Sequence, residues 1–81
     1  MPTPNHPALP QCSQFAAHPA RYLFAGWLNE ILMQQSLEHR SDAAHRLKGM
    51  LSAYMEMDVI SGDQYRAMTY ELNAFTFGAT V

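Results

Sequence analysis

The stretch of sequence that decides the fold reads Asp58-Val59-Ile60-Ser61-Gly62-Asp63-Gln64-Tyr65. Ser61 and Gln64 have the spacing of a capping box, in which each side chain bonds the backbone N–H of the other residue at the start of a helix. Ile60 before the cap and Tyr65 after it can form a hydrophobic staple that fixes how the chain enters that helix. The stretch therefore predicts a helix over residues 62–76.

A second amphipathic helix precedes this stretch. Its apolar residues recur at the three- and four-residue spacing of one helix face. They are Ala44, Leu47, Leu51 and Tyr54. Ser41 has the residue type of an N-cap, so we expect this helix over residues 42–58. Because the link to the helix over 62–76 is so short, the two helices should form a tight antiparallel hairpin.

Within Ala43–Leu72, several residues form a recognisable pattern of two leucines, an apolar turn ending in serine, a polar pair, an aromatic residue and a closing leucine. They are Leu47, Leu51, Asp58-Val59-Ile60-Ser61, Asp63, Gln64, Tyr65 and Leu72. This pattern resembles the short C-terminal helical hairpin family called SHOCT. Asp58 stands where that family prefers glycine, which puts the geometry of the turn in question. The resemblance implies an oligomerisation or docking module, and it carries over no catalytic residue.

A further helix is predicted over residues 19–38, because Pro19 is a favoured first-turn residue and apolar residues follow at helical spacing. One side carries the core stripe of Phe24, Trp27, Leu28 and Ile31. The opposite side is apolar as well, and it carries Tyr22, Gly26, Met33 and Leu37. So short a chain has few other elements to cover a helix on both sides. We therefore expect this second side to be an interface with another chain, joined by Met55 and Tyr70 of the hairpin.

Residues 1–18 are expected to form an extended, partly disordered arm. Four prolines fall in the first ten residues and disfavour helix there: Pro2, Pro4, Pro7 and Pro10. Leu9 and Phe15 are the residues able to pin this arm onto the rest of the chain. The sequence thus predicts an all-α fold, with a three-helix domain over 19–77 that contains an antiparallel hairpin, preceded by the proline-rich arm.

The composition limits the functions open to this chain. The 81 residues are 48% hydrophobic and 15% charged, with a formal net charge of −2, which is typical of a globular domain. Cys12 is the single cysteine, so an internal disulfide is impossible, and no histidine cluster has zinc spacing. A domain this small usually needs a staple, and self-association is the one that remains. We expect no metal and no cofactor. We also expect a cytoplasmic protein, because the apolar stretches fall short of the roughly 20 residues that span a membrane.

Basic residues gather in one part of the sequence. Three of the five Lys and Arg residues fall within nine positions, together with two histidines: His39, Arg40, His45, Arg46 and Lys48. This group is a candidate charged patch, for an acidic partner or for nucleic acid. The negative net charge disfavours nucleic acid, as does the presence of a single base, Arg66, in the would-be recognition helix.

Two hypotheses for function follow. The first is a small non-catalytic protein–protein interaction module that acts as a homodimer, with the size and composition of phage- or plasmid-borne inhibitors that modulate a host protein. The alternative is a small dimeric nucleic-acid-associated regulator that uses the basic end at residues 39–48. An enzyme is not expected, because the sequence shows no nucleophile paired with a base and an orienting acid.

Overall fold

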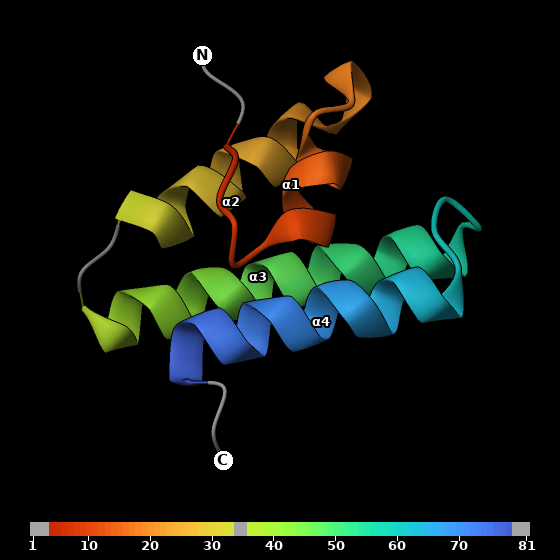
Figure 1. Ribbon diagram of the computed structural model, residues 1–81. Coiled ribbons are helices and arrows are strands. Elements are labelled where there is room, and N and C mark those ends of the chain that lie inside the picture. Colours follow the sequence, from red (N-terminus) through yellow and green to blue (C-terminus); the bar gives the residue numbers. More distant parts are fainter. Residues whose placement is uncertain (1–3, 34–35, 79–81) are drawn as a thin grey trace.

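The computed structural model describes residues 4–33 and 36–78, and the elements in these ranges are all helical. Two long helices, α3 (Leu37–Glu56) and α4 (Gly62–Phe77), lie side by side and antiparallel (Figure 1). The short α1 (Pro10–Ala16) and the longer α2 (Tyr22–Met33) cover one face of this pair, joined by the 3-10 turn η1 (Pro19–Arg21). The all-α class and the helical hairpin are confirmed.

The capping box at the start of α4 is confirmed in both directions. The Ser61 hydroxyl accepts from the Gln64 backbone N–H at 3.1 Å, and the Gln64 side-chain oxygen accepts from the Ser61 N–H at 2.8 Å. Ile60 beside the cap is buried, and Tyr65 packs against the core, as a hydrophobic staple requires. The start of α4 is therefore set by residues that are neighbours in sequence.

Asp58 takes the backbone conformation that a glycine would take in this turn. Its φ is 62°, in the left-handed region. Around it, the Val59 N–H bonds the Tyr54 carbonyl at 2.8 Å and the Asp58 N–H bonds the Met55 carbonyl at 3.1 Å, which is the Schellman pattern of a helix end. Aspartate tolerates this region better than most residues do. The departure from glycine therefore leaves a regular glycine-type C-cap in place.

The predicted boundary between the first two helices is wrong. We expected helices over 19–38 and 42–58, but α2 ends at Met33 and α3 begins at Leu37. The N-cap is Ser36, whose hydroxyl accepts from the His39 N–H at 3.5 Å, and it replaces the predicted Ser41. Between Ser36 and Ser41 no glycine or proline interrupts the chain, so the earlier cap starts a helix that continues into the predicted one. Residues 34 and 35 lie outside the described ranges.

The expectation of an extended arm over residues 1–18 is also wrong where α1 forms, at Pro10–Ala16. Pro10 does not break a helix; it occupies the first turn of α1, where its missing N–H is not needed. Leu9 and Cys12 are fully buried, and Phe15 packs edge-on against Phe24 with ring centroids 5.1 Å apart. The core therefore includes the N-terminal segment as well as the three expected helices. Its buried apolar residues are Leu9, Cys12, Ala16, Phe24, Leu28, Ile31, Ala43, Ala44, Leu47, Leu51, Ile60, Met68 and Leu72.

Candidate functional site

The outer face of α2 carries three of the predicted interface residues. Phe24, Leu28 and Ile31 on the inner face are fully buried. On the other side, Tyr22 is 72% exposed and Met33 is 78% exposed. These two residues are 11 positions apart, about three helical turns or roughly 16 Å, so they lie on the same side of the helix. The outer side of the helix thus carries exposed apolar side chains at both of its ends, with Asn29 and Glu30 between them in the sequence.

Gly26 lies between them on this face, one turn after Tyr22. A Cβ atom added at Gly26 meets no other atom within 4 Å. Its φ is not in the left-handed region, so neither packing nor backbone conformation within this chain requires a glycine here. The glycine therefore leaves the helix backbone uncovered at this point of the face, one turn after Tyr22.

The other predicted interface residues lie elsewhere. Leu37 is 59% exposed, but it belongs to the first turn of α3 rather than to α2. Met55 near the end of α3 and Tyr70 in the middle of α4 are both exposed, as expected for surface residues. The fold therefore divides the six candidates between the outer face of α2 and the hairpin.

The predicted charged patch is divided too. Its five residues all lie on α3, but the side chains that they contact belong to different helices. Arg46 pairs with Asp42 and stacks over the Trp27 ring of α2 at 4.8 Å. Lys48 donates to the Asn73 side-chain oxygen of α4 at 2.9 Å, and Arg40 lies over a ring of that same helix.

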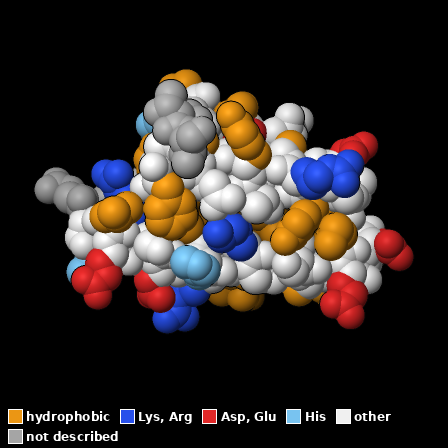
Figure 2. All heavy atoms as spheres, turned by 90° about the horizontal axis from the view of Figure 1, so that it is seen from below, with side chains coloured by type: hydrophobic (Ala, Val, Ile, Leu, Met, Phe, Trp, Pro, Cys, Tyr) orange, Lys and Arg blue, Asp and Glu red, His pale blue; other side chains and the backbone are white. Residues whose placement is uncertain are grey.

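His39 is exposed, and His45 places its Nδ1 atom 2.7 Å from the Ser41 carbonyl oxygen. Figure 2, which views the α3–α4 side, shows basic side chains separated by apolar and uncharged ones. No continuous basic surface forms on this face of the described chain.

Sequence reasoning missed the role of Glu71. The residue is 9% exposed, and its carboxylate accepts from the backbone N–H groups of Gln11 at 2.9 Å and Cys12 at 3.0 Å. These are N–H groups of the first turn of α1, which have no partner within their own helix. An acid of α4 thus caps a helix that lies about 60 residues earlier in the chain. No local sequence pattern predicts such a contact.

The thiol of Cys12 lies in the same region and is not a nucleophile. Burial raises the pKa of the Cys12 thiol well above its ordinary value, and the negative charge of Glu71 raises that pKa further. The Sγ atom lies 3.6 Å from the Met68 carbonyl oxygen, to which the thiol donates. A protonated, buried thiol of this kind is a structural group.

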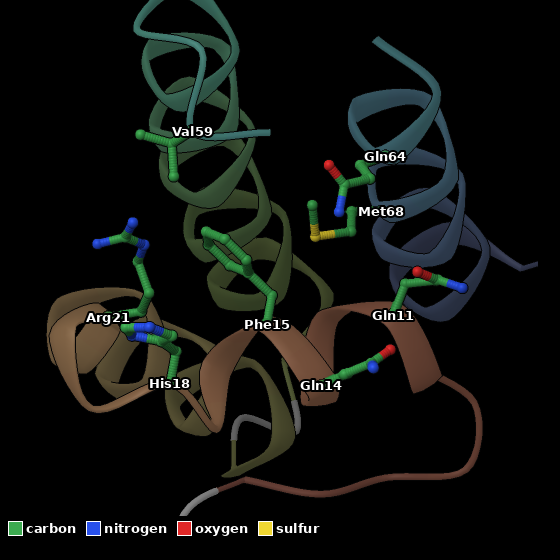
Figure 3. Close-up of a pocket in the computed structure, with 8 residues that line it drawn as sticks. All are labelled: Gln11, Gln14, Phe15, His18, Arg21, Val59, Gln64 and Met68. Carbon is green, nitrogen blue, oxygen red and sulfur yellow. The ribbon is translucent and has the colours of Figure 1, made fainter. Parts of the chain in front are cut away.

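Sequence reasoning also missed a pocket between α1, η1 and the start of α4. Its volume is about 380 Å³, and Figure 3 shows its lining. The lining residues are Gln11, Gln14, Phe15, His18, Arg21, Val59, Gln64 and Met68. The first five belong to the segment predicted as an arm and to the turn after it, so the pocket exists because that segment folds back.

No three His, Cys, Asp or Glu side chains in ranges 4–33 and 36–78 come together as a metal-binding group. Likewise, no helix in these ranges combines the length and the apolar character that crossing a membrane requires.

Comparison of the chain with protein-family models, curated proteins and solved structures finds no match. The resemblance of residues 43–72 to SHOCT therefore stays a prediction.

Proposed function

We propose that this chain is a small non-catalytic protein–protein interaction module that forms a homodimer through the outer face of α2. The observation that carries the proposal is the pair of exposed apolar side chains, Tyr22 and Met33, on one face of a helix whose other face is fully buried. Exposed apolar side chains that gather on one face are a common feature of interaction surfaces.

Gly26 supports a helix as the occupant of this face. A glycine inside a helix destabilises it by about 1 kcal/mol relative to alanine, and nothing within the chain requires one here. In a dimer related by twofold symmetry the same surface meets itself, so Gly26 of one copy lies near α2 of the other. A glycine at that point lets the two backbones approach closely.

No observation favours the alternative of a nucleic-acid-associated regulator. Of the five basic or histidine residues over 39–48, two Arg and one Lys already contact side chains of α2, α3 or α4. Three cations on one chain support only weak, salt-sensitive binding to a phosphate backbone. The proposal therefore rests on the apolar face alone.

The test is the oligomeric state of two variants by sedimentation equilibrium. Met33→Glu places a charge in the interface, and Gly26→Arg fills the gap that a second helix needs. Both should give monomers, while the circular dichroism of Gly26→Arg stays helical because its new side chain meets open space. Met57→Glu is the matched control, because Met57 is also exposed, at 63%, but lies at the end of α3.

A wild-type chain that sediments as a monomer throughout the micromolar range would contradict the homodimer. A dimer that survives both α2 substitutions would place the interface on another face. A dimer that is lost equally in Met57→Glu would show that any added acid disrupts it, and would remove the case for α2.

A further inference from the structure

The pocket beside α1 contains a cation, Arg21, and no acidic side chain occurs among the described residues that line it. Arg21 is half-buried, and its guanidinium carbon lies 5.5 Å from the ring centroid of Phe15 and 5.3 Å from that of Tyr54. The ion pairs of Arg46 and Arg66 lie on α3 and α4, away from Arg21. The Nε atom of Arg21 is buried without a hydrogen-bond partner. The aromatic rings hold the guanidinium in place, and its charge remains available to a ligand.

His18 offers a second hydrogen-bond donor to the pocket. Its Nδ1 atom accepts from the Ala20 backbone N–H at 3.2 Å, which caps the turn η1. A neutral imidazole that accepts at Nδ1 carries its proton on Nε2. The ring lines the pocket beside Arg21 (Figure 3), so its Nε2–H is a donor next to the cation.

Gln64 offers a third donor, and the capping box fixes its orientation. The side-chain oxygen is engaged by the Ser61 N–H at 2.8 Å, so the amide nitrogen is the end that remains free. Figure 3 shows this nitrogen directed to the inside of the pocket, toward Met68. An amide nitrogen donates and does not accept. The cap of α4 thus aims two N–H bonds into the pocket.

The rest of the lining is apolar or neutral. Phe15, Val59 and Met68 supply apolar surface, and no Asp or Glu occurs among the described residues that line the pocket. A volume of about 380 Å³ lies within the range of small-ligand sites. The lining thus combines one cation, the neutral donors of His18 and Gln64, the side-chain amides of Gln11 and Gln14, and apolar surface. This combination favours a ligand with a single negative charge and a short apolar group.

We propose that this pocket binds a carboxylate attached to a small apolar group, with the carboxylate against Arg21 and His18 and the apolar group against Phe15 and Met68, on the side of the pocket where Gln64 lies (Figure 3). A guanidinium matches the planar geometry of a carboxylate through two parallel hydrogen bonds. A phosphate carries nearly two charges, and this pocket offers one fixed cation. The carboxylate can come from a free carboxylic acid or from the C-terminus of a peptide.

The test is a titration of the ¹⁵N-labelled full chain with 4-methylpentanoate at low salt, followed by amide chemical shifts. The matched probe is 4-methylpentanamide, which has the same shape and no charge. Loss of a charge-assisted hydrogen bond weakens binding about tenfold or more. We therefore expect the acid to bind at least about tenfold more tightly than the amide, with shifts centred on Val59 and Gln64.

Variants separate the pocket from general effects of charge. Gln64→Glu can keep the bond to the Ser61 N–H while it turns a carboxylate toward the ligand, so it should weaken binding about tenfold or more with the fold intact. Arg21→Met should do the same. Arg46→Met is the control, because Arg46 also stacks on an aromatic ring but lies on α3. It should leave the affinity unchanged within about twofold.

Peptides ending in leucine, with a free or an amidated C-terminus, then identify the source of the carboxylate. Binding of the free-ended peptide assigns the pocket to chain termini, and binding of the small acid alone assigns it to free carboxylic acids. Equal affinity for the acid and the amide would overturn the proposal. So would tighter binding of inorganic phosphate, or full affinity in Gln64→Glu.

Discussion

The α3–α4 hairpin and the N-terminal segment over residues 4–18 reach well-defined structures by different means. In the hairpin, the residues that end α3 and begin α4 all lie in one short stretch, from Tyr54 to Gln64. In the N-terminal segment, the first turn of α1 is satisfied by Glu71, about 60 residues away. The turn of the hairpin is defined by residues that are close in sequence, whereas the start of α1 depends on a side chain of α4.

The comparison shows which structural features of so short a chain can be predicted from its sequence. A capping box or a Schellman turn is a pattern of adjacent letters, so it can be recognised before the fold is known. A carboxylate that caps a distant helix looks like any other acid in a helical sequence. Prolines in the segment then mislead, since Pro10 reads as a helix breaker when it is a first-turn residue.

Glu71→Ala should have the largest effect and break the N-terminal region first. It leaves two backbone N–H groups of α1, one buried and one part-buried, without an acceptor. We expect a loss of about 3 kcal/mol in the free energy of unfolding, measured by urea denaturation. Ser61→Ala is the matched change in the hairpin. It removes one local cap and should lower the free energy of unfolding by only about 1 kcal/mol. Equal losses would contradict the distinction between the two regions.

Cys12 should make stability fall at alkaline pH. Its folded pKa is raised, so below about pH 8.5 the thiol is protonated in both states and contributes no pH dependence. Above that pH the unfolded chain loses the proton and the folded chain keeps it. The free energy of unfolding should therefore decrease by about 1.4 kcal/mol per pH unit from this group.

Cys12→Ser removes the ionisable thiol at nearly constant volume. The stability difference between the wild type and this variant, measured in urea at pH 7 and pH 10 under reducing conditions, should shift by about 2 kcal/mol in favour of the variant at the higher pH. A difference that stays constant with pH would show that the thiol is exposed to solvent in the folded state.

Asp58→Gly should have the smallest effect, and it should stabilise the hairpin. Glycine takes the left-handed conformation without the steric cost that a Cβ atom adds, so the variant should be more stable by up to about 1 kcal/mol. Thermal unfolding should show a higher midpoint. A lower midpoint would mean that the aspartate side chain stabilises the turn by more than its backbone costs.

Much of the fold could be predicted from the sequence. The α4 helix begins where its capping box places it and ends at Phe77, one residue beyond the prediction. Met68 is buried, and Met55 and Tyr70 are exposed, as their positions on the hairpin suggest. The boundary near Ser36 was missed, because Ser36 and Ser41 have the same capping residue type and no glycine or proline between them marks where the helix begins.

The candidate surfaces were predictable to different degrees. The apolar outer face of α2 follows from helical periodicity, so Tyr22 and Met33 could be found in advance. The pocket around Arg21 could not, because four of its lining residues come from the segment that was expected to be extended. For the charged group over residues 39–48, the sequence predicted one patch that the structure divides. Proximity in sequence suggested a patch, but successive residues of one helix point in different directions.

The measurement that tests the folded N-terminal segment most directly is the rate at which a thiol reagent modifies Cys12 in the native wild-type chain. The buried thiol of α1 should react at least about a hundredfold more slowly than the same thiol in urea-unfolded chain, since reaction then requires opening of the structure. In Glu71→Ala this protection should largely disappear, while in Ser61→Ala it should remain. A native wild-type chain whose Cys12 reacts as fast as in the unfolded chain would show that the segment is the extended arm that the sequence suggested, and would contradict the docking of α1 on Glu71.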